Sequence, residues 1–309
     1  MQPKVAIIGA NGFVGRQLVE LLARRGRPAL GVVRSDEGAR VVLERGGIPF
    51  QVQDLQESSI RSLVPALEGC AGLVYTASVS AAAGAPDRTD PSGLVNVLGA
   101  CRAAGVPRFV FLSGLGIAHY GMNPHCTNPY FLAKMAGEVA LFRSDLGVAV
   151  FRPSYIFGVG DEFLSPLIRR VARERAIEIP GRGDYRLQPI SVADTARAIL
   201  GAIDDRARTS PRVIDLVGPE VLSYRALVSR IASLMGRPFE IRERPVEEAE
   251  AQARATGYFG LRAHDLACLL CDEISDPASV VSLIGGLLET VDVMLERTIA
   301  NLPPLETAE

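Results

Sequence analysis

Two side chains that could move a proton, Tyr130 and Lys134, lie four residues apart. On a helix this spacing places them on one face. A tyrosine hydroxyl has an ordinary pKa of about 10 and is a poor acid or base at neutral pH, but a nearby ammonium stabilises the phenolate and lowers that pKa. Ser113 ends an apolar run earlier in the chain and could donate to a substrate carbonyl. The three residues predict acid–base chemistry on a carbonyl or an alcohol.

A glycine-rich segment near the N-terminus could hold phosphate groups. Residues 5–8 are apolar and predict a buried parallel strand. Glycines follow the strand at positions 9, 12 and 15. Gly9 permits a tight turn, Gly12 lets a pyrophosphate approach the backbone, and Gly15 lets the next helix pack closely. The amide groups of a helix N-terminus favour phosphate oxygens. The residues predicted to contact a dinucleotide here are Gly9, Asn11, Gly12, Phe13, Val14 and Gly15.

A second predicted strand, residues 29–33, ends at Arg34, about twenty residues after the last motif glycine, where such sites meet the adenosine ribose. An acid there would accept a hydrogen bond from the ribose 2′-hydroxyl, whereas an arginine can hold a 2′-phosphate. Arg16 could assist. Asp36 lies close enough to keep NAD(H) as an alternative. The sequence therefore favours NADP(H).

The remaining chain alternates predicted strands and helices, which implies a right-handed, doubly wound parallel sheet of the α/β class, a Rossmann-type fold. Further strands are predicted at residues 50–52, 73–76, 108–112, 148–151 and 213–217. Ligands bind at the carboxyl ends of such strands, where the small residues Thr76 and Ser78 leave room for a cofactor.

Beyond residue 158 the chain is expected to leave the sheet and return to it. Residues 1–158, with 188–217, form the predicted dinucleotide-binding domain, and 159–187 with 218–309 a smaller, mostly helical substrate lobe. A loop is predicted at 179–183 and a helical pattern from 223 onward. Ser191 or Asp194 is placed to cap a helix that continues to residue 202.

These motifs resemble the extended and atypical short-chain dehydrogenase/reductases, the epimerase/dehydratase superfamily. The matching segments are the Gly9–Gly15 turn, residues 96–99, Ser113, the Tyr130/Lys134 pair, Arg152-Pro153 and residues 189–194. Residues 264–274 are also similar to the branch related to the NADPH-binding accessory subunit of complex I.

The resemblance implies further roles for individual residues. Tyr130 would relay a proton during hydride transfer, and Lys134 would also bind the nicotinamide ribose. Asp54 and Leu55 would meet the adenine edge, Pro153 would belong to the cofactor site, and Asn96 would be structural.

Three functions fit this pattern. The first is an NAD(P)-dependent oxidoreductase acting on a carbonyl or alcohol. The second is a sugar-nucleotide epimerase or dehydratase with retained NAD, for which Arg182 and Arg186 are weak candidates for a diphosphate clamp. The third is a non-catalytic NADPH-binding scaffold or redox sensor. Fold alone does not separate them.

Composition narrows the partners. A net charge of −2 over 309 residues argues against binding of nucleic acid. We therefore expect a small-molecule substrate. The chain could also form a homodimer. No apolar run reaches membrane-spanning length, and we expect the N-terminal residues to form a strand instead of a signal peptide. An odd count of five cysteines suits a reducing, cytoplasmic setting. Cys268 and Cys271 form a lone C-x-x-C expected to pack in a core, so no metal site is predicted.

Overall fold

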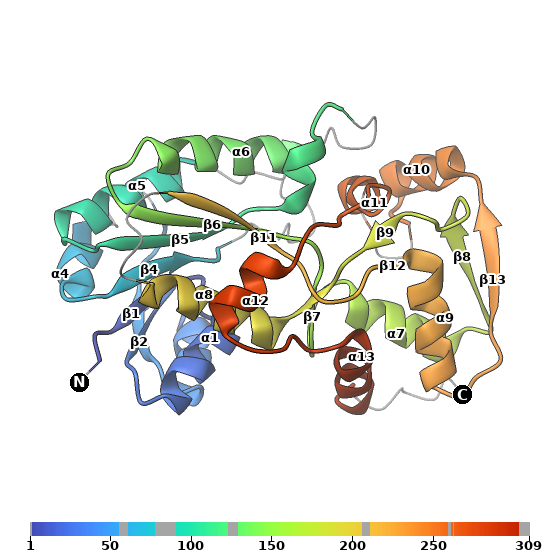
Figure 1. The fold of residues 1–309 in the computed structure, drawn as a ribbon, viewed down its shortest axis with the longest axis horizontal. Coiled ribbons are helices and arrows are strands. Elements are labelled where there is room, and N and C mark those ends of the chain that lie inside the picture. The colour runs from blue at the N-terminus through green and yellow to red at the C-terminus, as the bar shows by residue number, and fades with distance from the viewer. Residues whose placement is uncertain are drawn as a thin grey trace.

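The computed structural model describes residues 2–55, 61–77, 91–122, 129–205, 211–258, 261 and 263–302. Its centre is a seven-stranded sheet in the order β11-β6-β5-β4-β1-β2-β3, and every neighbouring pair is parallel (Figure 1). The strands are β1 (Val5–Ile8), β2 (Ala29–Val33), β3 (Ile48–Gln51), β4 (Gly72–Tyr75), β5 (Arg108–Leu112), β6 (Gly147–Pro153) and β11 (Arg212–Leu216). The predicted Rossmann-type sheet is confirmed.

Helices cover both faces of this sheet, because each face is apolar and must be buried. One apolar cluster lies under α1 (Phe13–Arg24), α8 (Val192–Asp204) and α12 (Ala278–Ile284). A second lies under α4 (Val64–Leu67) and α5 (Pro91–Ala103), with α6 (Pro129–Phe142) beside α5. In Figure 1 the α5–α6 layer lies above the sheet and α1 below it. The shorter elements are α2 (Asp36–Glu44) and the 3-10 turns η1 (Arg61–Leu63) and η2 (Leu115–His119).

A third apolar cluster belongs to the lobe at the other end of the molecule. Its helices are α7 (Leu164–Arg173), α9 (Tyr224–Leu234), α10 (Val246–Ala255), α11 (Ala263–Leu269) and α13 (Val291–Ala300). Two strand pairs accompany them: β9 (Arg186–Leu187) with β12 (Leu222–Ser223), and β8 (Ala176–Pro180) with β13 (Glu240–Arg244). A further pair, β7 (Ile156–Phe157) with β10 (Ile190–Ser191), contributes Ile190 to the first cluster and Phe157 to the third. The lobe is mostly helical, as expected, while the domain boundaries stay a prediction.

Two expectations for the lobe are wrong. Ile179 and Pro180 belong to strand β8 instead of a loop, and residues 240–244 form a strand inside the segment expected to be helical. These two strands pair with each other in parallel. Ile177 and Ile179 of β8 are buried in the lobe core. The pairing joins segments far apart in sequence, so local patterns do not reveal it.

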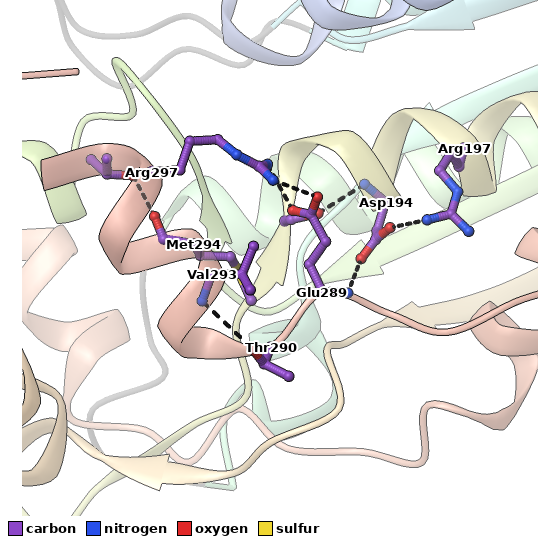
Figure 2. Close-up of polar contacts among 9 residues, drawn as sticks. Asp194, Arg197, Glu289, Thr290, Val293, Met294 and Arg297 are labelled. Carbon is purple, nitrogen blue, oxygen red and sulfur yellow. Dashed lines mark hydrogen bonds and ion pairs between the residues drawn. The ribbon is translucent and has the colours of Figure 1, made fainter. Parts of the chain in front are cut away.

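A buried carboxylate ties α8 to the segment before α13 (Figure 2). The Ser191 hydroxyl accepts from the Asp194 amide at 2.9 Å and is the cap of α8. The Asp194 carboxylate accepts from Arg197 Nη1 and from the Glu289 amide, both at 2.7 Å. The Glu289 carboxylate in turn accepts two hydrogen bonds from Arg297 of α13. The sheet helix and the C-terminal helix are therefore linked through Asp194.

Candidate functional site

The glycine turn has the geometry that the sequence predicts. Gly9 has a φ of +81°, which favours glycine, and the Gly12 amide donates to the Gly9 carbonyl at 3.0 Å. A Cβ on Gly15 would lie 2.2 Å from the Gly9 oxygen. The close approach that requires Gly15 is therefore to the turn itself, one residue beyond the strand.

Gly12 and the start of α1 fit an anionic group. A Cβ on Gly12 would meet Gly9 O at 3.2 Å and no other described atom within 4 Å, and its φ of −71° is ordinary. No described side chain caps α1 and no acid occupies its first turn, whereas hydroxyls cap α2, α8, α9 and α13. The first amides of α1 are thus left for another acceptor. The arrangement fits a pyrophosphate.

The other predicted residues of the turn surround it. Val14 is buried in the core, Phe13 packs against that core, and the Asn11 side chain faces Gly38 of α2. The Thr76 hydroxyl donates to the Ile8 carbonyl at 2.8 Å, so it holds the end of β4 against the turn. Ser78 lies outside the described residues.

Arg34 follows β2 and is exposed, and no described carboxylate pairs with it. The next residue, Ser35, caps α2 by accepting from the Gly38 amide. Arg16 is engaged elsewhere: it donates to the Val159 carbonyl at 3.2 Å and lies 5.6 Å from the Phe13 ring centroid. Arg34 is therefore the better placed of the two arginines to bind a ligand phosphate.

The loop after β3 is held by α5. Asn96 Nδ2 donates to the Leu55 carbonyl at 2.9 Å, and Leu55 packs close to Gly93. Asp54 is exposed beside it. The contact gives Asn96 the structural role that the resemblance implies.

Ser113 follows β5, and Lys134 contacts the last residue of that strand. Ser113 is 3% exposed and its amide donates to the Phe151 carbonyl at 2.7 Å, while its hydroxyl has no described partner. Lys134 Nζ donates to the Leu112 carbonyl at 2.7 Å and lies 4.9 Å from the Phe111 ring centroid. Burial lowers the pKa of Lys134 to about 8, opposed by the Glu138 carboxylate. Tyr130 lies one helical turn earlier on α6, and its side chain is outside the described part.

An ion pair on the same helix, one turn after this lysine, is not predicted by the sequence. Arg152 of β6 donates to both oxygens of Glu138, at 3.0 Å and 2.6 Å. The Glu138 side chain is only 3% exposed. An acid four residues after Lys134 is a signal for a helix-face contact, but the arginine comes from a separate strand.

The C-terminal segment reaches the end of β6, next to Pro153. Ser154 donates to the Glu273 carbonyl at 3.0 Å, and Glu273 is buried, which raises the pKa of its carboxyl to about 8. Arg186 binds the Asp272 carboxylate at 2.6 Å and Arg182 pairs with Asp184 at 3.0 Å. Both arginines suggested for a diphosphate clamp therefore already have carboxylate partners.

The C-x-x-C segment is not a simple core element. Cys271 is disulfide-bonded, and its partner is not Cys268. Cys271 is 1% exposed, as the expected core packing requires, whereas a disulfide does not suit the reducing setting inferred from the cysteine count. The described residues contain no group of three or more His, Cys, Asp or Glu that could hold a metal ion.

No helix in the part of the chain that the structure describes is long and apolar enough to cross a bilayer.

Comparison with known proteins shows an NAD(P)H-binding family. A family model described as NAD(P)H-binding matches residues 9–206. The 2-alkyl-3-oxoalkanoate reductase of Stenotrophomonas maltophilia is 24% identical over an alignment of 257 residues that covers 76% of each chain. Subunit 9 of the NADH dehydrogenase 1 alpha subcomplex of Arabidopsis thaliana is 25% identical over 72% of this chain and 55% of its own length. The UDP-glucose 4-epimerase of Thermotoga maritima shares the fold, with a TM-score of 0.74 at 20% identity over 96% and 97% of the two chains.

Proposed function

The chain belongs to this NAD(P)H-binding family, and from that premise we propose that it is an NADPH-dependent reductase of a small-molecule carbonyl that acts through Ser113, Tyr130 and Lys134. Its relatives include reductases and a dehydrogenase, and they mark it as an NAD(P)-dependent enzyme of the oxidoreductase and epimerase superfamily. The choice of NADPH, the substrate and the catalytic set are the proposal.

The observation that carries the proposal is the Ser113 hydroxyl. It is buried at the carboxyl end of β5 and has no described hydrogen-bond partner. A buried hydroxyl left without a partner costs free energy, so its presence calls for a ligand that satisfies it. Lys134 reaches the carbonyl of the preceding residue, so a donor and a cation converge at one strand end. A substrate carbonyl bound there would accept from Ser113.

The residues around the turn fit a dinucleotide, which when bound supplies the hydride. The Gly12 turn and the first amides of α1 would hold the pyrophosphate, and Arg34 would hold an adenosine 2′-phosphate. Asp54 and Leu55 would border the adenine, and Lys134 and Pro153 would border the nicotinamide ribose.

In this proposal the protein's own groups handle the proton. Tyr130 donates it to the oxygen of the carbonyl that is being reduced. The Lys134 ammonium stabilises the phenolate that remains, and Ser113 holds the substrate oxygen. Water is kept away from Ser113 and Lys134 by their burial.

The substrate proposal starts from the relative that reduces 2-alkyl-3-oxoalkanoates. A 3-oxo acid or ester is therefore the first compound class to assay. An epimerase acting on sugar nucleotides is less well supported, because Arg182 and Arg186 are already in ion pairs. A binding role without turnover, by likeness to the complex I subunit, is the remaining alternative.

A homodimer and a cytoplasmic location stay predictions. Leu132, Val139 and Phe142 are exposed on α6, and Val95 is exposed on the neighbouring α5. A second copy of the chain would dock on this apolar surface. Light scattering of the purified protein measures the mass of the assembly and so tests the homodimer.

The testing experiment is a turnover assay with a panel of 3-oxo esters, other ketones, aldehydes, quinones and UDP-sugars, following loss of NADPH or change of the sugar. We expect NADPH oxidation with at least one ketone. Tight NADPH binding without turnover across the panel would favour the scaffold, and sugar interconversion with NAD would favour the epimerase.

A further inference from the structure

Lys134 lies at one end of a row of charges of alternating sign. Glu138 follows it by one turn of α6, and Arg152 binds Glu138 through two hydrogen bonds. Asp215 of β11 is the register partner of Arg152 on the neighbouring strand, and its carboxylate raises the pKa of Arg152, although less than Glu138 does. Asp215 is held in turn by the Ser275 hydroxyl at 2.7 Å. The row runs from the proposed cofactor site across the ends of β6 and β11.

Glu138 is an unusual residue at this depth. Its side chain is 3% exposed, and burying a carboxylate is costly unless it is well paired. It is not among the residues proposed to touch cofactor or substrate. Arg152 supplies the pairing with a two-point contact, which holds the carboxylate in one orientation. The charge of Glu138 then acts in a poorly solvated region, where electrostatic interactions are strong.

Lys134 is the group on which this charge acts. Burial opposes the ammonium form of Lys134, and Glu138 favours it. The groups described in contact with Lys134 include the Leu112 carbonyl and the Phe111 ring. Tyr130 precedes it on the same helix. Arg152 binds Glu138 from β6, and Asp215 is the register partner of Arg152 on β11.

We propose that Glu138, clamped by Arg152, is a positioning residue that keeps Lys134 in its ammonium form and aimed at the end of β5 while the cofactor is bound. The proposal rests on the proposed contact between Lys134 and the nicotinamide ribose. An ammonium at this place attracts the anionic cofactor and stabilises the Tyr130 phenolate, whereas a neutral amine does neither.

The test is the pH dependence of NADPH affinity, measured by calorimetry from pH 7 to 9.5, above the range in which a phosphate monoester titrates. For the wild type we expect affinity to fall roughly tenfold as pH rises through about 8, where Lys134 loses its proton. In Glu138→Gln the fall should occur at lower pH, because the field that favours the ammonium is gone. Glu138→Asp, which keeps a carboxylate, should restore part of the shift.

A second variant separates electrostatics from folding. Glu138→Gln alone leaves Arg152 without its carboxylate and could impair folding. The double variant Glu138→Gln/Arg152→Met removes both charges, so it should also shift the fall in affinity to lower pH, by less than Glu138→Gln alone, because the opposing charge of Arg152 is gone as well. Asp145→Asn is the matched control, since it removes an exposed carboxylate just after α6 and should keep the wild-type profile.

Folded Glu138 variants that bind NADPH with the wild-type pH dependence would overturn the proposal and leave Glu138 a packing residue. If wild-type affinity did not change with pH and Lys134→Met bound NADPH equally well, the cofactor role of Lys134 would itself be wrong, and this inference would fall with it.

Discussion

Lys134 Nζ lies 2.7 Å from the carbonyl oxygen of Leu112, the residue that precedes Ser113. The contact holds the ammonium at the residue before Ser113, whose buried hydroxyl has no described hydrogen-bond partner. It joins the helix that carries Tyr130 to the strand that ends at Ser113. This hydrogen bond is one of the contacts between the two segments of the proposed catalytic set, together with that of Lys134 with the Phe111 ring of β5.

The first prediction concerns catalysis. Tyr130→Phe removes one hydroxyl and little volume, so fold and cofactor binding should survive while turnover of the ketone found in the panel falls about 10²–10⁴-fold. Ser113→Ala should lose rate with less effect on the cofactor. Lys134→Met should lose rate and also bind NADPH more weakly. Steady-state kinetics with calorimetry on the same preparations measures both quantities.

Tyr224→Phe is the matched control, because Tyr224 is buried in the lobe core away from β5. An active protein in which Tyr130→Phe kept full rate would show that the proton comes from another group.

The second prediction separates two glycines of one turn. Gly12→Val should abolish NADPH binding with little change in Tm, because its backbone is ordinary and a Cβ meets only Gly9 O, at 3.2 Å. Gly15→Ala should instead lower stability by about 1–3 kcal/mol, since its Cβ would lie 2.2 Å from the Gly9 oxygen. Calorimetric titration and thermal melts distinguish the two effects. Unchanged NADPH affinity in Gly12→Val would refute the pyrophosphate assignment.

The third prediction concerns cofactor choice. Arg34 is exposed after β2 and available to a 2′-phosphate. One charge-assisted hydrogen bond contributes about 1.5–3 kcal/mol, roughly ten- to a hundredfold in affinity. We expect NADPH to bind more tightly than NADH, and Arg34→Ala to lose most of that difference. Arg40→Ala, an exposed arginine on α2, should keep it. Equal affinities of the wild type for the two cofactors would contradict the NADP assignment.

What the sequence could reveal was local. Apolar runs that end in glycine or small residues mark strands β1 and β4, and the spacing of Tyr130 and Lys134 needs only one helix. The hydroxyl cap at Ser191 was also within reach, although Asp194 was an equal candidate. The Asp194 carboxylate instead accepts a hydrogen bond from the Glu289 amide, which lies 95 residues later in the chain.

The remainder depended on tertiary contacts. Glu240–Arg244 is rich in charged residues that suit a helix. It forms a strand because its backbone pairs in parallel with β8. The clamp of Arg152 on Glu138 required the register of β6 against α6. From the sequence, Arg186 is a candidate for a diphosphate clamp. In the structure it donates to the Asp272 carboxylate, which lies 86 residues later in the chain.

The last prediction concerns pH and the C-terminal segment. Burial raises the pKa of the Glu273 carboxyl from 4.5 to about 8. Between those values the folded protein keeps a proton that the unfolded chain releases, so stability falls as pH rises. The contribution of the protonated Glu273 carboxyl to the free energy of unfolding is complete below pH 4.5 and is lost as pH rises through about 8.

Glu273→Gln replaces the carboxyl with an amide that stays neutral, and it keeps the backbone contacts to Arg186 and Ser154. We expect its Tm at pH 8 to exceed that of the wild type, and its decline in Tm between pH 5.5 and 8 to be shallower. Glu44→Gln, at an exposed and weakly paired site on α2, should follow the wild-type curve. A Glu273→Gln curve parallel to the wild type over this range would show that Glu273 is ionised in the folded protein, and that solvent or a cation reaches its carboxylate.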